Sequence, residues 1–245
     1  MAPQAHISFD VDSIHRNFLD VQRHFHDINE RLDCQRDFFD DEVIGNLLNA
    51  YRYVNQRLAK NPKKHMIDYD VMLELNAIVL TGIDPLRRKE YRNFLKETEK
   101  KSLHYIDDLM KWYERHQHSD DNPHEIAGGL YVRILAQPQL FIEGNHRTGA
   151  LVANYHLLMA KQQPFILTTA NAVEFFNLAS QVKFQDTSIK SRFKRATGWH
   201  DEKARMSAFL KENANAFTCP SPPDNADIKS HDVLMNRGPE TLALS

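Results

Sequence analysis

The chain has 245 residues, 42% of them apolar, and a formal net charge of −2 at pH 7. This length and apolar content are enough for one sizeable hydrophobic core, so we expect one main domain. The nearly balanced charge excludes a general nucleic-acid binder, which would carry a strong basic excess, and we expect no nucleic acid among the partners.

Glycine and cysteine are both scarce. The sequence holds 8 glycines, and alternating strand-like runs are hard to find, which favours an all-α fold. Cys34 and Cys219 lie far apart without CxxC spacing, so we expect neither a disulfide framework nor a zinc site, and a reducing compartment. The start lacks a signal-peptide pattern, and no window of about 18 apolar residues is free of charge. We therefore expect a cytoplasmic protein without a membrane partner.

The first predicted element is a helix over residues 14–32. Its apolar residues recur at alternating spacings of four and three, which places them on one helical stripe. These residues are Ile14, Phe18, Val21, Phe25, Ile28 and Leu32. We expect residues 1–39 to dock this helix on the core, and the alternative use of the stripe is to form a homodimer.

Two more helices are predicted before residue 85. One follows the acids at 40–42 and ends at Asn61 and Pro62, and the next covers residues 69–82, with Gly82 suited to a helix C-cap. Residues 86–101 are dense in Arg, Lys and Glu, and periodicity does not decide between an exposed helix and an irregular segment.

Helical patterns then resume and continue to about residue 213. Buried stripes cover residues 106–112 and 126–135 on one side of Pro138, and 151–159 on the other. Residues 139–145 are therefore predicted to be a loop between two buried helices. Further helices are predicted at 172–181, 187–196 and 201–213, and residues 215–245, rich in Pro, Ser, Asp and Asn, are expected to be a disordered tail.

The loop after Pro138 carries the parts of a phosphate site. A helix start presents unpaired N–H groups and a partial positive charge, and Arg147 adds a forked, permanently charged donor. Glu143 is a hard oxygen ligand, and Mg²⁺ is commonly held by one or two carboxylates together with phosphates. On chemistry alone, an ordinary helix entry with solvated charges fits these residues equally well.

The residues 139–150, Gln-Leu-Phe-Ile-Glu-Gly-Asn-His-Arg-Thr-Gly-Ala, resemble the motif HPFxxGNGRxxR of the Fic domain family, and the similarity extends over about 40–196. The resemblance implies an all-α Fic-type domain over 40–214, with a short flap hairpin at 85–105 that would grip a protein target by strand addition. It also implies transfer of AMP from ATP to a hydroxyl side chain, with Mg²⁺ and ATP or another nucleotide as cofactors.

The resemblance assigns most of its roles to residues that are intact here. Glu143 resembles the Mg²⁺-binding acid, Phe141 anchors the loop, and the other positions belong to the nucleotide and phosphate cradle. The cradle positions are Gly144, Asn145, His146, Arg147 and Gly149.

Four positions of the motif depart from the family pattern. Gln139 stands where the family has its catalytic His, Leu140 for Pro, His146 for the second Gly and Ala150 for the second Arg. The amide of Gln139 has no usable basicity, so ordinary AMP transfer should be very slow. His146 is a speculative replacement for the base, and its alternative role is a partly exposed residue that donates a hydrogen bond.

Three functions follow from these residues. The first is a module that binds a nucleotide or another phosphorylated small molecule with little or no AMP transfer. The second is an active Fic-type transferase with a substitute base, and the third is a structural interaction protein built on the stripe at 14–32. The intact Glu143, Asn145 and Arg147 favour the first.

Overall fold

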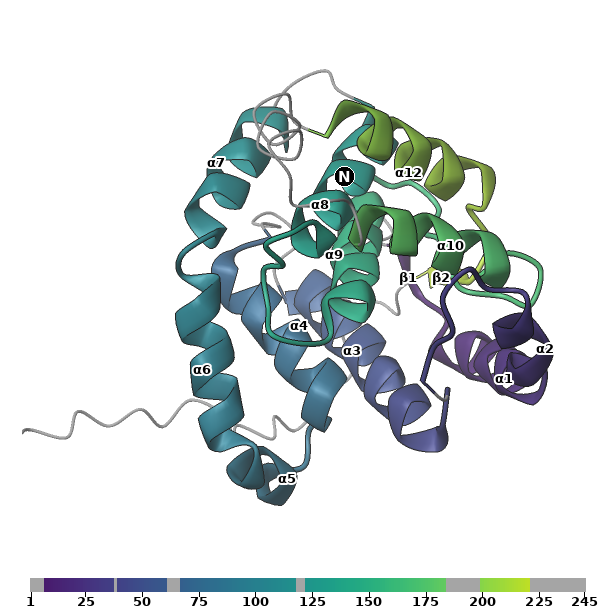
Figure 1. Cartoon of the computed structure of the whole chain (residues 1–245), viewed down its shortest axis with the longest axis horizontal. Helices are drawn as coiled ribbons and strands as arrows, with labels where there is room; N and C mark the ends of the chain where they lie inside the picture. Colours follow the sequence, from purple (N-terminus) through teal and green to yellow (C-terminus); the bar gives the residue numbers. More distant parts are fainter. Residues whose placement is uncertain (1–6, 38, 61–66, 118–121, 184–198, 221–245) are drawn as a thin grey trace, which may run out of the picture.

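The computed structural model describes residues 7–37, 39–60, 67–117, 122–183 and 199–220, and most of them are helical (Figure 1). The predicted all-α class is confirmed. The helices are α1 Val11–Arg23, α2 Phe25–Glu30, α3 Asp41–Lys60, α4 Tyr69–Thr81, α5 Pro85–Glu90, α6 Arg92–Ser102, α7 Ile106–Gln117, α8 Pro123–Leu135, α9 Asn145–Met159, α10 Ala172–Lys183 and α12 His200–Glu212.

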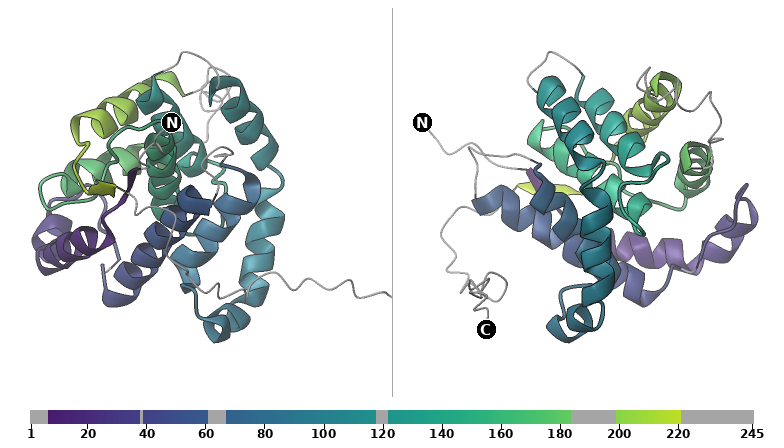
Figure 2. Two further views of the ribbon diagram at one scale, coloured as in Figure 1. Left: turned by 180° about the vertical axis from the view of Figure 1, so that it is seen from behind. Right: turned by 60° about the vertical axis from the view of Figure 1, so that its left-hand side comes forward.

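Helix α9 lies at the centre of the molecule. It packs against α8, α4 and α3, and α12 also packs against α8 (Figures 1 and 2). One cluster of buried apolar residues joins α1, α3, α4 and α7 to α9, and a second joins α8, α9, α10 and α12. The loop that precedes α9 is therefore attached to a well-buried helix in the middle of the fold.

The apolar stripe at 14–32 is buried inside this chain. All six of its residues belong to the main core cluster. Asp10 begins α1 by accepting a hydrogen bond from the backbone N–H of Ser13 at 3.0 Å, and the helix is interrupted at His24, where α1 gives way to α2. An apolar repeat cannot reveal such an interruption, because the residues on both sides stay on the same face.

Two short strands connect the beginning and the end of the described chain. Strand β1, Ile7–Phe9, pairs antiparallel with β2, Thr218–Pro220. The tail expected from residue 215 therefore starts with ordered backbone, since Asn215 also donates to the carbonyl of Pro164 at 3.0 Å. Residues 221–245 and the helix predicted at 187–196 lie outside the described residues.

The flap hairpin expected at 85–105 is not formed, and that prediction is wrong. Helix α5 begins at Pro85, whose ring presets a helical backbone angle, and the side chain of Asp84 caps it by accepting from Leu86 N–H at 3.0 Å. Helix α6 follows directly, composed mainly of Lys, Glu and other helix-favouring residues. A protein target at this segment would meet helices and no strand edge.

None of the helices in the described ranges is long and apolar enough to cross a membrane.

Candidate functional site

Helix α9 begins at a glycine that no other residue could replace without strain. Gly144 precedes the helix with φ 76°, in the left-handed region, and a Cβ atom there would lie 2.9 Å from Nδ2 of Asn76. No side chain caps this helix by a hydrogen bond. The backbone N–H groups of its first turn are therefore the natural partners of an acceptor that approaches from the loop.

The side chain of Asn145 holds the loop in shape. Its Oδ1 accepts a hydrogen bond from the backbone N–H of Phe141 at 2.9 Å, and its Nδ2 donates to the carbonyl of the same residue at 3.0 Å. Lys101 of α6 donates to that carbonyl as well, at 2.8 Å. Asn145 is 4% exposed. Both polar groups of the Asn145 side chain are thus committed to the loop backbone, and any phosphate contact of this residue would use its main chain.

A second asparagine, which the sequence did not single out, supports the loop from α4. Asn76 donates through Nδ2 to the carbonyl of Glu143 at 2.9 Å and to Oγ1 of Thr148 at 3.1 Å. It is almost fully buried among the apolar residues of α4. The one available signal was a polar residue at a core position of an apolar helix, since buried polar groups are kept where they have partners.

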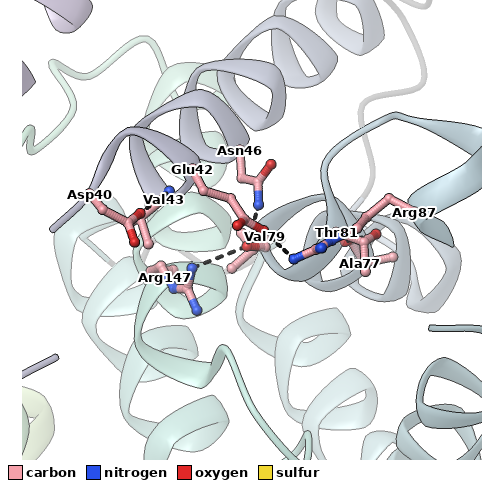
Figure 3. A network of polar contacts seen from close by, with 9 residues as sticks. All are labelled: Asp40, Glu42, Val43, Asn46, Ala77, Val79, Thr81, Arg87 and Arg147. Carbon is pink, nitrogen blue, oxygen red and sulfur yellow. Dashed lines mark hydrogen bonds and ion pairs between the residues drawn. The ribbon is translucent and has the colours of Figure 1, made fainter. Parts of the chain in front are cut away.

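Arg147 extends from the first turn of α9 toward α3 and α4 (Figure 3). Its Nη1 donates to the carbonyl of Val79 at 3.1 Å. Burial lowers the pKa of this guanidinium, and the carboxylates of Glu143 and Asp40 oppose the shift, so the side chain stays charged. The bond to Val79 uses one of five N–H donors, but the nearby carboxylates compete with any anion for the others.

Glu143 is the residue that could bind a metal ion. Its side chain is exposed, and its negative charge acts to raise the pKa of Arg147. In the described part of the chain, no group of three or more His, Cys, Asp or Glu side chains is arranged to hold a metal ion. One carboxylate beside a helix N-terminus fits Mg²⁺ when phosphates and water complete its shell, which is the usual arrangement for that ion.

The ring of His146 is held between two neighbours. Arg36 donates from Nη1 to Nε2 of His146 at 3.0 Å, and Tyr131 contacts Nδ1 through its hydroxyl at 3.1 Å. Because arginine can only donate, Nε2 must be the unprotonated nitrogen. Burial lowers the pKa of His146 to about 3, and the charges of Arg36, Lys183 and Arg147 act in the same direction. The ring is neutral, and both of its nitrogens are in use.

Arg36 is a further residue that the sequence did not single out. Besides His146, it donates to the carbonyl of Phe176 at 3.0 Å and to Oγ of Ser180 at 2.6 Å, and its guanidinium lies 5.5 Å from the centre of the Phe176 ring. It therefore ties the segment between α2 and α3 to the beginning of α9 and to α10. Nothing local in the sequence links residue 36 to residue 146.

The other predicted site residues are placed by the same loop and helix. Gln139 is half-buried next to Leu140 and Phe141, which are both buried. Gly149 is buried where α9 crosses α8, and a Cβ atom there would lie 3.2 Å from the Tyr131 ring. Its contacts are packing contacts. The structure thus brings Asn145, His146 and Arg147 together in the first turn of α9, directly after Gly144, and these three side chains are directed to different neighbours.

In comparisons with known proteins, no family model matches the chain, and no curated protein matches it.

Proposed function

We propose that this chain is a Fic-like module that binds a nucleotide or another phosphorylated small molecule at the beginning of α9 and transfers AMP little or not at all. The observation that carries the proposal is the uncapped start of α9 behind the left-handed Gly144, in a loop whose shape is fixed by Asn145 and Asn76. A preorganised set of backbone donors stabilises an anion without reorganisation cost.

The binding side of the proposal has three components. Backbone N–H groups of the first turn of α9 would contact phosphate oxygens, and the helix dipole would favour the negative charge. Arg147 lies on the same turn and would supply further N–H donors. Glu143, together with the phosphates, would hold Mg²⁺, which neutralises part of the phosphate charge when it is bound.

The catalytic side of the proposal rests on the absence of a usable base in the loop. Gln139 carries an amide, which does not accept a proton near neutral pH. His146 has both ring nitrogens engaged by Arg36 and Tyr131 and a pKa of about 3, so it offers no free site for the proton of an attacking hydroxyl. A missing general base costs about 10² to 10⁴-fold in rate. The alternative, an active transferase with His146 as the base, is therefore not favoured.

The binding half is tested by calorimetric titration with Mg-ATP and Mg-ADP. We expect saturable binding by the unaltered chain and a clear loss of affinity in Arg147→Ala. Arg23→Ala is the matched control, because Arg23 is an exposed residue of α1 that pairs only locally with Asp20. Absence of binding, or equal affinity in the two arginine variants, would refute a nucleotide site that depends on Arg147.

The catalytic half is tested by intact-mass measurement of candidate target proteins incubated with the chain and Mg-ATP. We expect no gain of the mass of AMP above background. Robust transfer by the unaltered chain would overturn this half of the proposal and leave the binding half standing.

A further inference from the structure

A second pocket, separate from the loop before α9, lies between α8 and α12. It has a volume of about 310 Å³, and its lining includes Asn122, His124, Glu125, Lys203, Ser207 and Lys211. None of the residues 139–149 lines it. A function for this pocket is therefore independent of the proposed nucleotide site.

The two helices approach each other closely enough to build the pocket because α8 carries glycine at the crossing. A Cβ atom on Gly128 would lie 2.3 Å from Oγ of Ser207 and 2.9 Å from its backbone N. From this crossing, lining residues recur along α12 at steps of three or four, which places them on one face. That face of α12 borders the first turn of α8, where His124 and Glu125 lie.

The charges in the pocket are not balanced. Lys203 is compensated by Glu125, with Nζ 3.3 Å from Oε2. Lys211 has no ion pair in the described part of the chain, although it lines the same pocket. Glu125, the acidic residue of the lining, is therefore already paired, and the ammonium group of Lys211 remains available to an anion that enters the pocket.

His124 lines the same pocket and also carries an unsatisfied polar atom. The residue is 9% exposed, yet its Nε2 is buried without a hydrogen-bond partner among the described residues. Burial lowers the pKa of His124, and the charge of Lys211 lowers it further, so the ring is neutral near pH 7 and Lys211 lies within electrostatic reach. A neutral imidazole can donate one N–H bond to an oxyanion, and a buried polar atom without a partner is costly.

From this arrangement we infer that the pocket between α8 and α12 binds a small molecule through an oxyanion group, a phosphate or a carboxylate, held by the ammonium group of Lys211 next to the imidazole of His124. A metal ion does not fit, because the ammonium group of Lys211 would repel it and the described residues hold no set of three metal-ligating side chains. The pocket volume suits a compact ligand that enters as a whole.

The test follows the imidazole signals of His124 by NMR while inorganic phosphate or malonate is added near neutral pH at constant ionic strength. We expect a saturable shift of His124 with at least one of the two anions, and a His124→Gln variant assigns the signal. Lys211→Gln should weaken binding by about tenfold, since it removes the charged partner. Lys89→Gln is the matched control, because Lys89 is exposed on α5 at the other end of the molecule (Figure 1).

The outcome also separates the two sites. Arg147→Ala should leave the shift of His124 unchanged, so failure of the nucleotide site and failure of this pocket are distinguishable. A shift with phosphate alone assigns a phosphate ligand, and a shift with malonate alone assigns a carboxylate. No saturable shift with either anion, or equal affinity in Lys211→Gln and Lys89→Gln, overturns the inference.

Discussion

The side chain of Asn145 forms a closed pair of hydrogen bonds with the backbone of Phe141, accepting from its N–H at 2.9 Å and donating to its carbonyl at 3.0 Å. The two residues bracket the turn that leads into α9. Because the N–H and C=O of Phe141 are satisfied in this way, the loop can enter the core without leaving buried polar groups unpaired. The shape of the candidate site thus depends on a side chain whose polar groups are both bonded within the loop.

Asn145→Ala is expected to destabilise the protein. The change leaves the backbone N–H of Phe141 without its partner, whereas the carbonyl keeps its bond from Lys101. An orphaned buried donor and a lost buried bond together cost about 2 to 3 kcal/mol. Urea unfolding measures the loss, and Asn49→Ala is the control, because Asn49 only accepts an exposed bond from Arg52. Equal stability of the two variants would show that the pair of bonds is dispensable.

Gly144→Ala and Gly45→Ala are expected to change the free energy of unfolding in opposite directions. At Gly144 a methyl group meets Nδ2 of Asn76 at 2.9 Å, and the φ of 76° is unfavourable for alanine, so we expect a loss of about 1 to 2 kcal/mol. At Gly45, inside α3, nothing lies within 4 Å of the added carbon, and alanine should stabilise by about 0.5 to 1 kcal/mol. Thermal or urea unfolding decides, and a neutral Gly144→Ala would contradict the strained turn.

The sequence predicts the helices of this fold where burial repeats with helical period. The stripes at 14–32, 69–82 and 126–135 became helices because apolar residues on one face have to be buried together, and Pro138 ended the last of these as expected. Residues 86–101 carry no such stripe. Their helices follow from local chemistry, the cap at Asp84 with Pro85 behind it, and this short signal does not by itself exclude the flap that the family resemblance places there.

The residues of the candidate site also divide into those that a local sequence pattern indicates and those that it does not. Gly144 and Arg147 are local to a turn and a helix start, so their sequence pattern pointed to them. Asn76 reaches the loop and Arg36 reaches the first turn of α9, both from other elements, and contacts across such separations have no local signature in the sequence. The pairing of β1 with β2 cannot be predicted for the same reason, since two three-residue strands far apart in the sequence leave no pattern to recognise.

The stability of the protein should fall in mild acid, because buried histidines must be protonated on unfolding. The pKa of His146 is lowered to about 3 and that of His156 to about 4, in both cases chiefly by burial. In mild acid these two histidines are therefore protonated in the unfolded chain and neutral in the folded chain. The contribution of these histidines to the stability of the fold is complete above their pKa in the unfolded chain, about 6.5, and is lost as the pH falls toward their pKa values in the folded protein. Each histidine adds a slope of up to about 1.4 kcal/mol per pH unit in that range.

His146→Gln isolates one of the two contributions. The amide oxygen of glutamine can still accept from Arg36, but it does not titrate. Free energies of unfolding measured in urea at about pH 7.5 and pH 5 should therefore differ less in the variant than in the unaltered chain. His26→Gln is the control, since His26 is an exposed residue of α2 whose side chain is 83% accessible. The same pH dependence in all three proteins would show that His146 is not the buried neutral group described above.

Gln139→His tests whether the missing base is what keeps the proposed module from transferring AMP. The half-buried position adjoins Leu140 and Phe141 at the fixed end of the loop, so a histidine there would be carried by an unchanged backbone. General-base catalysis is worth about 10² to 10⁴-fold. We therefore expect the rate of transfer to a target hydroxyl to rise by an amount in that range over Gln139→Asn, which keeps an amide and supplies no base.

Adding Ala150→Arg to Gln139→His should raise the rate of transfer further, because a second guanidinium stabilises developing phosphate charge. Intact-mass detection of AMP on a target, with Arg147→Ala added to abolish the site, gives the readout. If the histidine and asparagine variants transfer equally, a feature of the site other than residue 139 limits the chemistry. The first candidate is His146, whose ring lies in the first turn of α9 and is held there by Arg36 and Tyr131.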